Sequence, residues 1–165
     1  MRRQARGHES RRALPDAEIV AGVLSRGGKI CLLKRSASVR CDAGCWHCIT
    51  GHLPPAQRPV RQILAEIAEE AGLPSDGLVL KSRAVFDRPG GDGRLYRIHA
   101  FHFACCTAEV RLNWEHESVR WVSPHEARRL RTVYWLQEVL DRLGLKEAPA
   151  SEPCTVESIY FAGSV

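Results

Sequence analysis

The chain has 165 residues, of which 44% are hydrophobic and 26% are charged, a composition typical of one globular domain with its own core. Its apolar stretches are all far shorter than the roughly 20 residues of a membrane-spanning helix. The basic N-terminus does not lead into the apolar segment of a secretory signal. These features favour a cytoplasmic protein without a membrane partner.

The net charge of +5 is concentrated at the N-terminus, because residues 1–12 hold five Arg and one Glu. The rest of the chain is close to neutral and shows no basic stripe of the kind that binds nucleic acid. We therefore do not expect a nucleic acid partner, and the sequence leaves a homodimer open. We interpret residues 1–16 as a flexible basic leader, 17–145 as the domain and 146–165 as a tail.

The hydrophobic pattern predicts a mixture of strands and helices. Strands are expected at 18–25, 30–34, 78–87, 95–105 and 118–122, with a short apolar run at 46–49. Helices are expected at 58–71, from the Ser123 capping box onward, and near 133–143. The elements lack the regular alternation of a doubly wound sheet, so the fold class is α+β.

A local cluster of Cys41, Cys45, His47 and Cys48 could be interpreted as a zinc site. Structural zinc sites usually have a second pair of ligands at similar spacing, and this chain has none downstream. Seven cysteines, an odd number, in a chain without an export signal favour reduced thiols. Buried or unused thiols are therefore preferred over zinc.

The predicted helix at 58–71 carries three carboxylates, Glu66, Glu69 and Glu70, along one edge. The neighbouring arc is apolar and is expected to face the core; it holds Val60, Ile63, Leu64, Ile67, Ala68 and Ala71. A solvated acidic face usually has Lys or Arg three or four residues away, and none is present here. A hard divalent cation such as Mg²⁺ could neutralise these glutamates.

The same segment resembles the signature box of the Nudix hydrolases. Seven of the nine fixed positions of the box match, namely Gly51, Glu66, Ile67, Glu69, Glu70, Gly72 and Leu73. The two departures are Gln57, where the family has Glu, and Ala65, where it has Arg. The family often pairs these two side chains, and its Arg also orients the neighbouring glutamates. Losing both avoids an unpaired charge but leaves that orientation unsupported.

The resemblance covers roughly residues 18–143 and implies the Nudix fold, a mixed β-sheet sandwiched between helices. Arg35 corresponds to a substrate-side Arg at the end of a strand. The segment Trp114–Val122 resembles the family's glutamate-bearing loop and the strand that follows it.

By this resemblance, the protein hydrolyses a phosphoanhydride in a nucleoside diphosphate linked to another group. Mg²⁺, with Mn²⁺ as an alternative, would be held by Glu66, Glu69, Glu70 and the carbonyl of Gly51. The catalytic residues would be Glu66, Glu69 and Glu115, with Glu66 or Glu115 as the base and Glu117 a weaker candidate. Arg35 and Trp46 are the expected substrate contacts, Trp46 by stacking on a base as Phe86 also could.

The substrate is less constrained than the chemistry. The segment Trp46–Gly51 with Glu115-His116 and Trp121 is similar to the branch that cleaves dATP or dihydroneopterin triphosphate. Diadenosine polyphosphate and nucleotide-sugar hydrolysis also stay open. The alternative of a different class is a catalytically weakened Nudix-fold nucleotide-binding or regulatory domain, which the two box departures favour.

Overall fold

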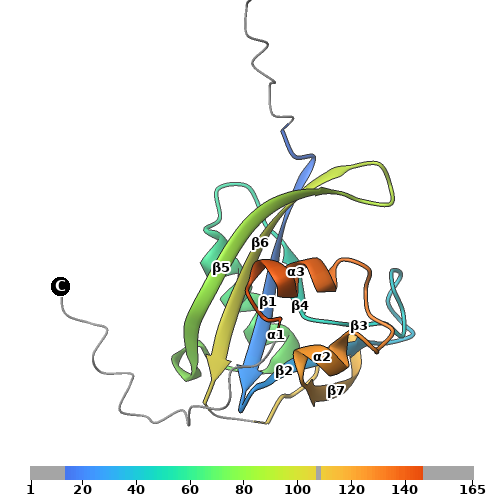
Figure 1. The fold of residues 1–165 in the computed structure, drawn as a ribbon. Coiled ribbons are helices and arrows are strands. Elements are labelled where there is room, and N and C mark those ends of the chain that lie inside the picture. Colours follow the sequence, from blue (N-terminus) through green and yellow to red (C-terminus); the bar gives the residue numbers. More distant parts are fainter. Residues whose placement is uncertain (1–13, 107–108, 147–165) are drawn as a thin grey trace, which may run out of the picture.

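Strand β1 lies at the centre of a seven-stranded mixed sheet and pairs with three other strands (Figure 1). The computed structural model describes residues 14–106 and 109–146. The strands are β1 (Ala17–Arg26), β2 (Lys29–Arg35), β3 (Trp46–His47), β4 (Ile49–His52), β5 (Leu78–Pro89), β6 (Leu95–Cys105) and β7 (His116–Val122). The helices are α1 (Pro59–Ala71), the 3₁₀ turn η1 (Ser75–Gly77), α2 (Pro124–Ala127) and α3 (Leu136–Arg142).

The sheet runs in the order β3-β2-β1-β6-β5, with β4 added to β1 and β7 to β2. The β1–β6 pair is parallel and the other pairs are antiparallel. The predicted turn between β1 and β2 is present, since Arg26 pairs with Lys29 and the two intervening glycines have φ of 55° and 76°. Glycine tolerates such positive φ values without steric cost.

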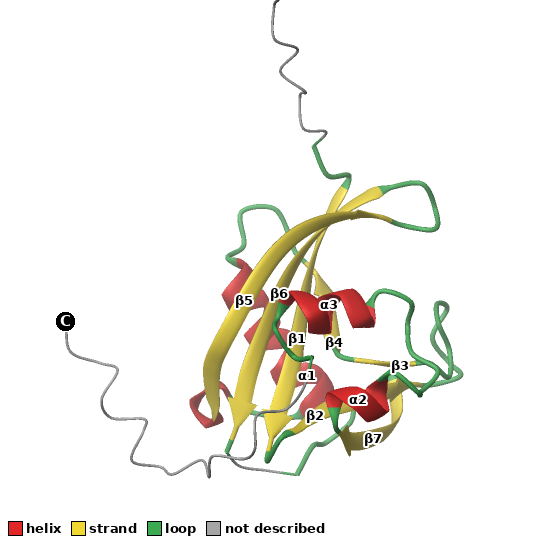
Figure 2. Ribbon diagram, in the orientation of Figure 1, coloured by secondary structure: helices red, strands yellow, loops and turns green. Residues whose placement is uncertain are grey.

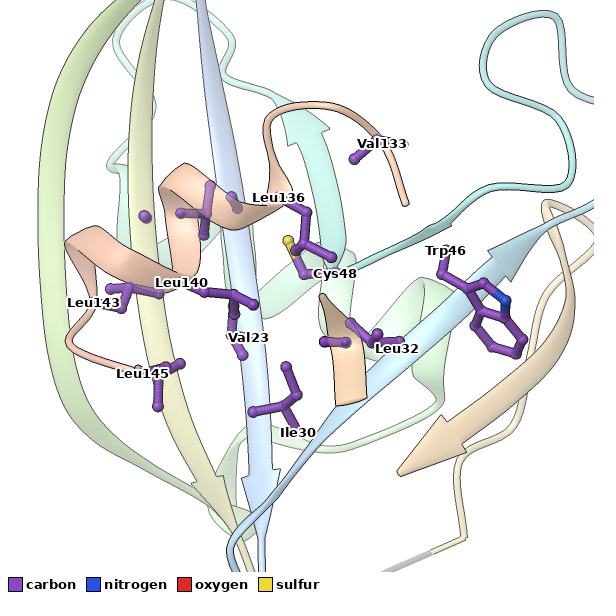
Figure 3. Close-up of a cluster of buried hydrophobic side chains, with 14 of the residues drawn as sticks. Val23, Ile30, Leu32, Trp46, Cys48, Val133, Leu136, Leu140, Leu143 and Leu145 are labelled. Atoms are coloured by element: carbon purple, nitrogen blue, oxygen red, sulfur yellow. The ribbon is translucent and has the colours of Figure 1, made fainter. Parts of the chain in front are cut away.

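Helices cover both faces of the sheet, as Figure 2 shows, with α1 on one side and α3 on the other. One core packs α3 against the sheet through Leu136, Val139 and Leu140 (Figure 3). The other core packs α1 against the opposite face through Ile63, Ile67 and Ala71. This arrangement confirms the expected α+β class and the mixed sheet between helices.

Local sequence signals set the helix ends as predicted. Pro59 begins α1, and Gly72 ends it with φ of 65° while its N–H donates to the carbonyl of Ala68 at 3.1 Å. In α2, the Ser123 hydroxyl accepts from the N–H of Glu126 at 3.1 Å, and the Glu126 carboxylate accepts from the N–H of Ser123 at 2.7 Å. The capping box is therefore confirmed.

The predicted helix at 133–143 begins three residues late, at Leu136. The N–H of Val133 donates to the carbonyl of Trp46 at 3.0 Å, and Thr132 forms a bridge with Trp46. These backbone contacts to β3 hold the segment in a non-helical conformation. The apolar run at 46–49 is likewise divided between β3 and β4.

The buried face of α1 is rotated from the predicted apolar arc. Val60 is 38% exposed and Ala68 is also exposed, whereas Glu70 is only 3% exposed. The expectation that Val60 and Ala68 face the core was therefore wrong, and Glu70 is buried with the apolar side of α1 instead. Its carboxyl turns toward β4, where the backbone N–H of Thr50 donates a hydrogen bond to it.

Most of the predicted leader and tail lies outside the described residues, so those two boundaries stay predictions. No helix in the described part is long and apolar enough to cross a membrane. Among the described residues, Cys31, Cys41, Cys45 and Cys48 are free thiols. Cys106 is disulfide-bonded, which departs from the expectation of reduced thiols.

We predict that Gly22→Ala lowers the free energy of unfolding by about 1–3 kcal/mol. A Cβ at Gly22 would lie 2.8 Å from Cδ1 of Ile63, which is fully buried and has little room to move. Urea unfolding measures the effect. The matched control is Gly91→Ala, because a Cβ there meets nothing within 4 Å; equal losses in the two variants would contradict the account.

Candidate functional site

Glu66 of α1 lies against Gly51 of β4. A Cβ built on Gly51 would overlap the Glu66 carboxylate, so the absence of a side chain at position 51 makes room for it. The Glu66 Oε1 accepts a hydrogen bond from Gln62 Nε2 at 2.7 Å. The pKa of Glu66 is raised, chiefly by burial and further by the charges of Glu69 and Glu115.

Glu70 is the most buried carboxyl of the site. It accepts a hydrogen bond from the backbone N–H of Thr50, yet its Oε2 has no hydrogen-bond partner among the described residues. Burial, followed by the charges of Glu115 and Glu66, raises the pKa of Glu70 to about 9. Metal-free Glu70 is therefore protonated at neutral pH.

The imidazole of His116 faces this carboxyl, with 3.6 Å between His116 Nε2 and Glu70 Oε2. Burial lowers the pKa of His116 to about 4, and the charge of Arg35 adds to the effect. The opposite shifts of the two pKa values make this a neutral acid facing a neutral imidazole rather than a salt bridge.

The loop before β7 brings Glu115 to the glutamates of α1. Asn113 Oδ1 accepts from the N–H of Glu115 at 3.1 Å, and the Asn113 carbonyl accepts from the N–H of His116 at 3.3 Å. The Glu115 carbonyl in turn accepts from the N–H of Ser36 at 2.8 Å, beyond the end of β2. Asn113 was not a predicted site residue, although an Asn two residues before a loop glutamate is a recognisable turn signal.

Arg35 lies at the end of β2, close enough to Glu70 to oppose the rise of its pKa. Its Nε donates to the Cys41 carbonyl at 2.8 Å, and its Nη1 lies 3.3 Å from His47 Nε2. These contacts fix the guanidinium beside the carboxylates. The family resemblance implies that Arg35 contacts substrate there.

The Trp46 side chain does not point toward the carboxylates. Successive side chains of a strand point to opposite faces, so Trp46 and His47 of β3 face opposite sides of the sheet. Trp46 is 8% exposed in the α3-side core, and the Arg120 guanidinium lies 5.1 Å from its ring centroid. The residue that β3 directs to the site is His47, which is 3.4 Å from His116 between their Nε2 atoms. Phe86 is also buried in the α3-side core.

The structure gives no support to the zinc interpretation. In the described ranges, no group of three or more His, Cys, Asp or Glu side chains is already arranged around a metal position. Cys41 is exposed, whereas Cys48 is buried and its thiol pKa is raised to about 12 by burial and then by the charge of Glu70.

The same finding means that Glu66, Glu69 and Glu70 do not form a closed ligand set without metal. Glu69 is exposed on α1, one residue from the buried Glu70. The raised pKa values of Glu66 and Glu70 and the unpartnered Oε2 of Glu70 nevertheless fit a divalent cation, which would compensate the mutual repulsion of these carboxylates.

The two departures from the box are both exposed. Gln57 is exposed, and its Oε1 accepts from the N–H of Arg58 at 3.2 Å. Ala65 is exposed on α1. Glu117, the weaker candidate for the base, instead pairs with Lys34 at 2.6 Å across β2 and β7.

A cavity of about 380 Å³ opens beside β4, and His52, the residue after Gly51, is part of its lining. Ile19 of β1 and Ile98 of β6 also line it. Three aromatic residues belong to the lining, namely Tyr96, Tyr134 and Trp135. Cavities of this size accept small organic ligands.

We predict that Glu70→Gln stabilises the metal-free protein at about pH 8 by roughly 1–3 kcal/mol. The folded-state pKa near 9 exceeds the ordinary 4.5, so the folded protein keeps a proton that the unfolded chain loses between these values. Stability should therefore fall as pH rises through this window, and the glutamine variant should lose that part of the slope.

Urea unfolding in EDTA at about pH 5.5 and pH 8 measures both quantities. The control is Glu117→Gln, which changes an exposed carboxyl to the same amide. An unchanged pH slope in Glu70→Gln would show that Glu70 is not held in its neutral form.

Comparisons with known proteins identify the family of this chain. The NUDIX domain family model matches residues 15–143. The CTP pyrophosphohydrolase of Escherichia coli (strain K12) is 31% identical over 110 residues, which cover 67% of this chain and 78% of that protein. Together these matches establish a family and not a substrate.

Solved structures share the fold. The solution structure of the E. coli ORF135 protein has a TM-score of 0.63 at 26% identity, covering 82% of this chain and 94% of that one. The E. coli dihydroneopterin triphosphate pyrophosphohydrolase has a TM-score of 0.60 at 14% identity, covering 80% and 98%; this likeness concerns the fold alone and leaves the predicted branch untested. With seven box positions present and the family model matching most of its length, the chain belongs to the Nudix hydrolase family.

Proposed function

We propose that this protein is a metal-dependent nucleotide pyrophosphohydrolase that cleaves a phosphoanhydride of a nucleoside triphosphate. The observation that carries the proposal is that Glu66, Glu70 and Glu115 lie close enough to act on one another, while His52, whose charge also acts on Glu66, lines a cavity with three aromatic residues. Carboxylates that form no ion pair with Lys or Arg among the described residues suit a divalent metal, and a cavity with aromatic lining residues suits a nucleoside.

Glu66, Glu69, Glu70 and the Gly51 carbonyl are the proposed ligands of Mg²⁺, with Mn²⁺ as an alternative. When bound, the metal would neutralise charge on the phosphate oxygens. Arg35 would contact a phosphate, because its guanidinium is already fixed beside Glu70.

Glu115 is the favoured base for the attacking water, because its loop is held by Asn113 and Ser36 and its charge reaches both α1 carboxyls. Glu66 stays the second candidate for the base, and Glu69 is assigned to the metal. Trp46 is not retained as a stacking residue, since its ring is packed in the core.

We propose that the nucleobase of the substrate binds in the cavity beside β4, which we call the base subsite. CTP is the first substrate to test. The named relative acts on CTP, and the cavity wall offers Tyr134 and Trp135 as flat partners for a base. Arg88 also lines the cavity, its guanidinium lies 4.6 Å from the Tyr134 ring centroid, and its buried Nε has no hydrogen-bond partner among the described residues. That Nε could donate to a base carbonyl.

The alternative is a nucleotide-binding or regulatory domain whose catalysis is weakened. The specific observation in its favour is the loss of the box Glu and Arg at Gln57 and Ala65. The retained Glu66, Glu69 and Glu70 argue against it.

We predict that the protein hydrolyses CTP to CMP and pyrophosphate in the presence of Mg²⁺. Phosphorus NMR identifies the products. A panel with dATP, dihydroneopterin triphosphate, diadenosine tetraphosphate and a nucleotide sugar tests the other candidates. Glu69→Gln should lower kcat by about 100-fold or more, because it removes a proposed metal ligand without burying a new group.

The matched control for this assay is Glu117→Gln, which removes a carboxylate from the neighbouring strand β7 and should change kcat by less than about threefold. Nucleotide binding without turnover of any panel member would overturn the enzyme and support the binding domain. Equal losses in both variants would contradict the placement of the metal on α1.

We also predict that Arg88→Met raises the KM for CTP about tenfold and leaves kcat nearly unchanged, because Arg88 lines the proposed base subsite and not the carboxylate cluster. Steady-state kinetics with CTP measures both constants. A decrease in kcat with an unchanged KM would show that the cytosine base does not bind in this cavity.

A further inference from the structure

The carboxylate of Glu66 lacks the box Arg that would orient it in the Nudix family, because position 65 is Ala. Its carboxylate is pressed against Gly51 and lies near two other acidic side chains, Glu69 and Glu115. Position 65 holds Ala, which is exposed and offers no donor. Gln57 uses its side-chain oxygen to cap the N–H of Arg58.

The one side-chain hydrogen bond that the described residues give Glu66 comes from Gln62. Gln62 lies four residues earlier on α1, and its Nε2 donates to Glu66 Oε1 at 2.7 Å. Residues four apart are neighbours on one helix face, where an amide and a carboxylate can meet. Gln62 is half-buried, so water competes less for this contact than at a fully exposed position.

The oxygen that Gln62 holds is also the carboxylate atom nearest to where a Cβ of Gly51 would lie. The Gln62 amide thus holds Oε1 in the space that the missing side chain of Gly51 leaves open, and Oε2 is available to a metal or a water. A neutral amide achieves this without adding a cation that would compete with the metal.

We propose that Gln62 is a positioning residue that holds Glu66 for metal binding, in place of the box Arg that this chain lacks at position 65. This inference rests on the proposed metal site. Donors that orient a ligand from outside the coordination shell typically change metal affinity or activity by 10–100-fold when removed. Gln62 takes that part through a contact within α1.

The test compares Gln62→Met with Gln57→Met. Both replace a glutamine of this segment by an unbranched side chain of similar length, but only the first removes a donor from Glu66. Metal affinity is measured with Mn²⁺ alone, from the electron paramagnetic resonance signal of the free ion. We expect the Mn²⁺ dissociation constant to rise about tenfold in Gln62→Met and to stay within about twofold in Gln57→Met.

A second experiment tests whether an Arg at position 65 can replace Gln62 in supporting Mn²⁺ binding. Adding Gln57→Glu and Ala65→Arg to Gln62→Met should return the Mn²⁺ affinity to within about threefold of the original protein. Thermal unfolding of each variant confirms that the comparison is made between folded proteins. Failure of this triple variant to regain affinity would overturn the claim that Gln62 stands in for the Arg.

The outcomes separate this inference from the proposed function. Tight Mn²⁺ binding that Gln62→Met weakens supports the inference even if no nucleotide is hydrolysed. Unchanged Mn²⁺ affinity and unchanged CTP turnover in Gln62→Met overturn the inference while leaving the enzyme intact. Absence of Mn²⁺ binding by the original protein overturns both.

Discussion

The close approach of α1 to the sheet determines the positions of the carboxylates. Gly22 on β1 leaves room for Ile63, and Gly51 on β4 leaves room for Glu66. A side chain at either position would push the helix or the carboxylate outward. With both glycines present, α1 buries Glu70 as well as its apolar stripe, and the carboxyls of Glu66 and Glu70 lie where Glu115 can act on them. The close packing of α1 on β1 and β4 therefore determines both the packing of the core and the positions of the site carboxyls.

This arrangement reduces the stability of the metal-free protein. Glu70 has a raised pKa and an unpartnered oxygen, and Glu66 is held near other negative charges with only a neutral amide as side-chain donor. Unpaired acidic groups in a buried position are unfavourable unless protonated or compensated. A divalent cation would reverse the balance, because the same repulsion that raises the pKa values favours metal binding. Reduced stability and metal affinity then have one physical cause.

Local signals in the sequence predicted much of the fold because they act on neighbouring backbone. Pro59 and Gly72 bound α1, and the Ser123–Glu126 box begins α2. Box spacing likewise selected Gly51 and Glu66, which lie against each other in the structure. The inward turn of Glu70 was missed, since it depends on a backbone N–H of β4. Whether His47 or Trp46 points toward the carboxylates depends on which face of β3 is covered by α3. The late start of α3 depends in turn on the hydrogen bond between Val133 and β3. Such features follow from contacts between distant segments, which periodicity does not encode.

The central claim is that the glutamates around β4 form one metal site. It is tested most directly by calorimetric titration of the protein with Mg²⁺ at about pH 7.5, in two buffers with different ionisation enthalpies, which yields the number of protons released. Because the pKa of Glu70 is near 9 without metal, binding should release close to one proton, and Glu70→Gln should abolish that release. Binding without proton release, or release that persists in Glu70→Gln, would contradict the account.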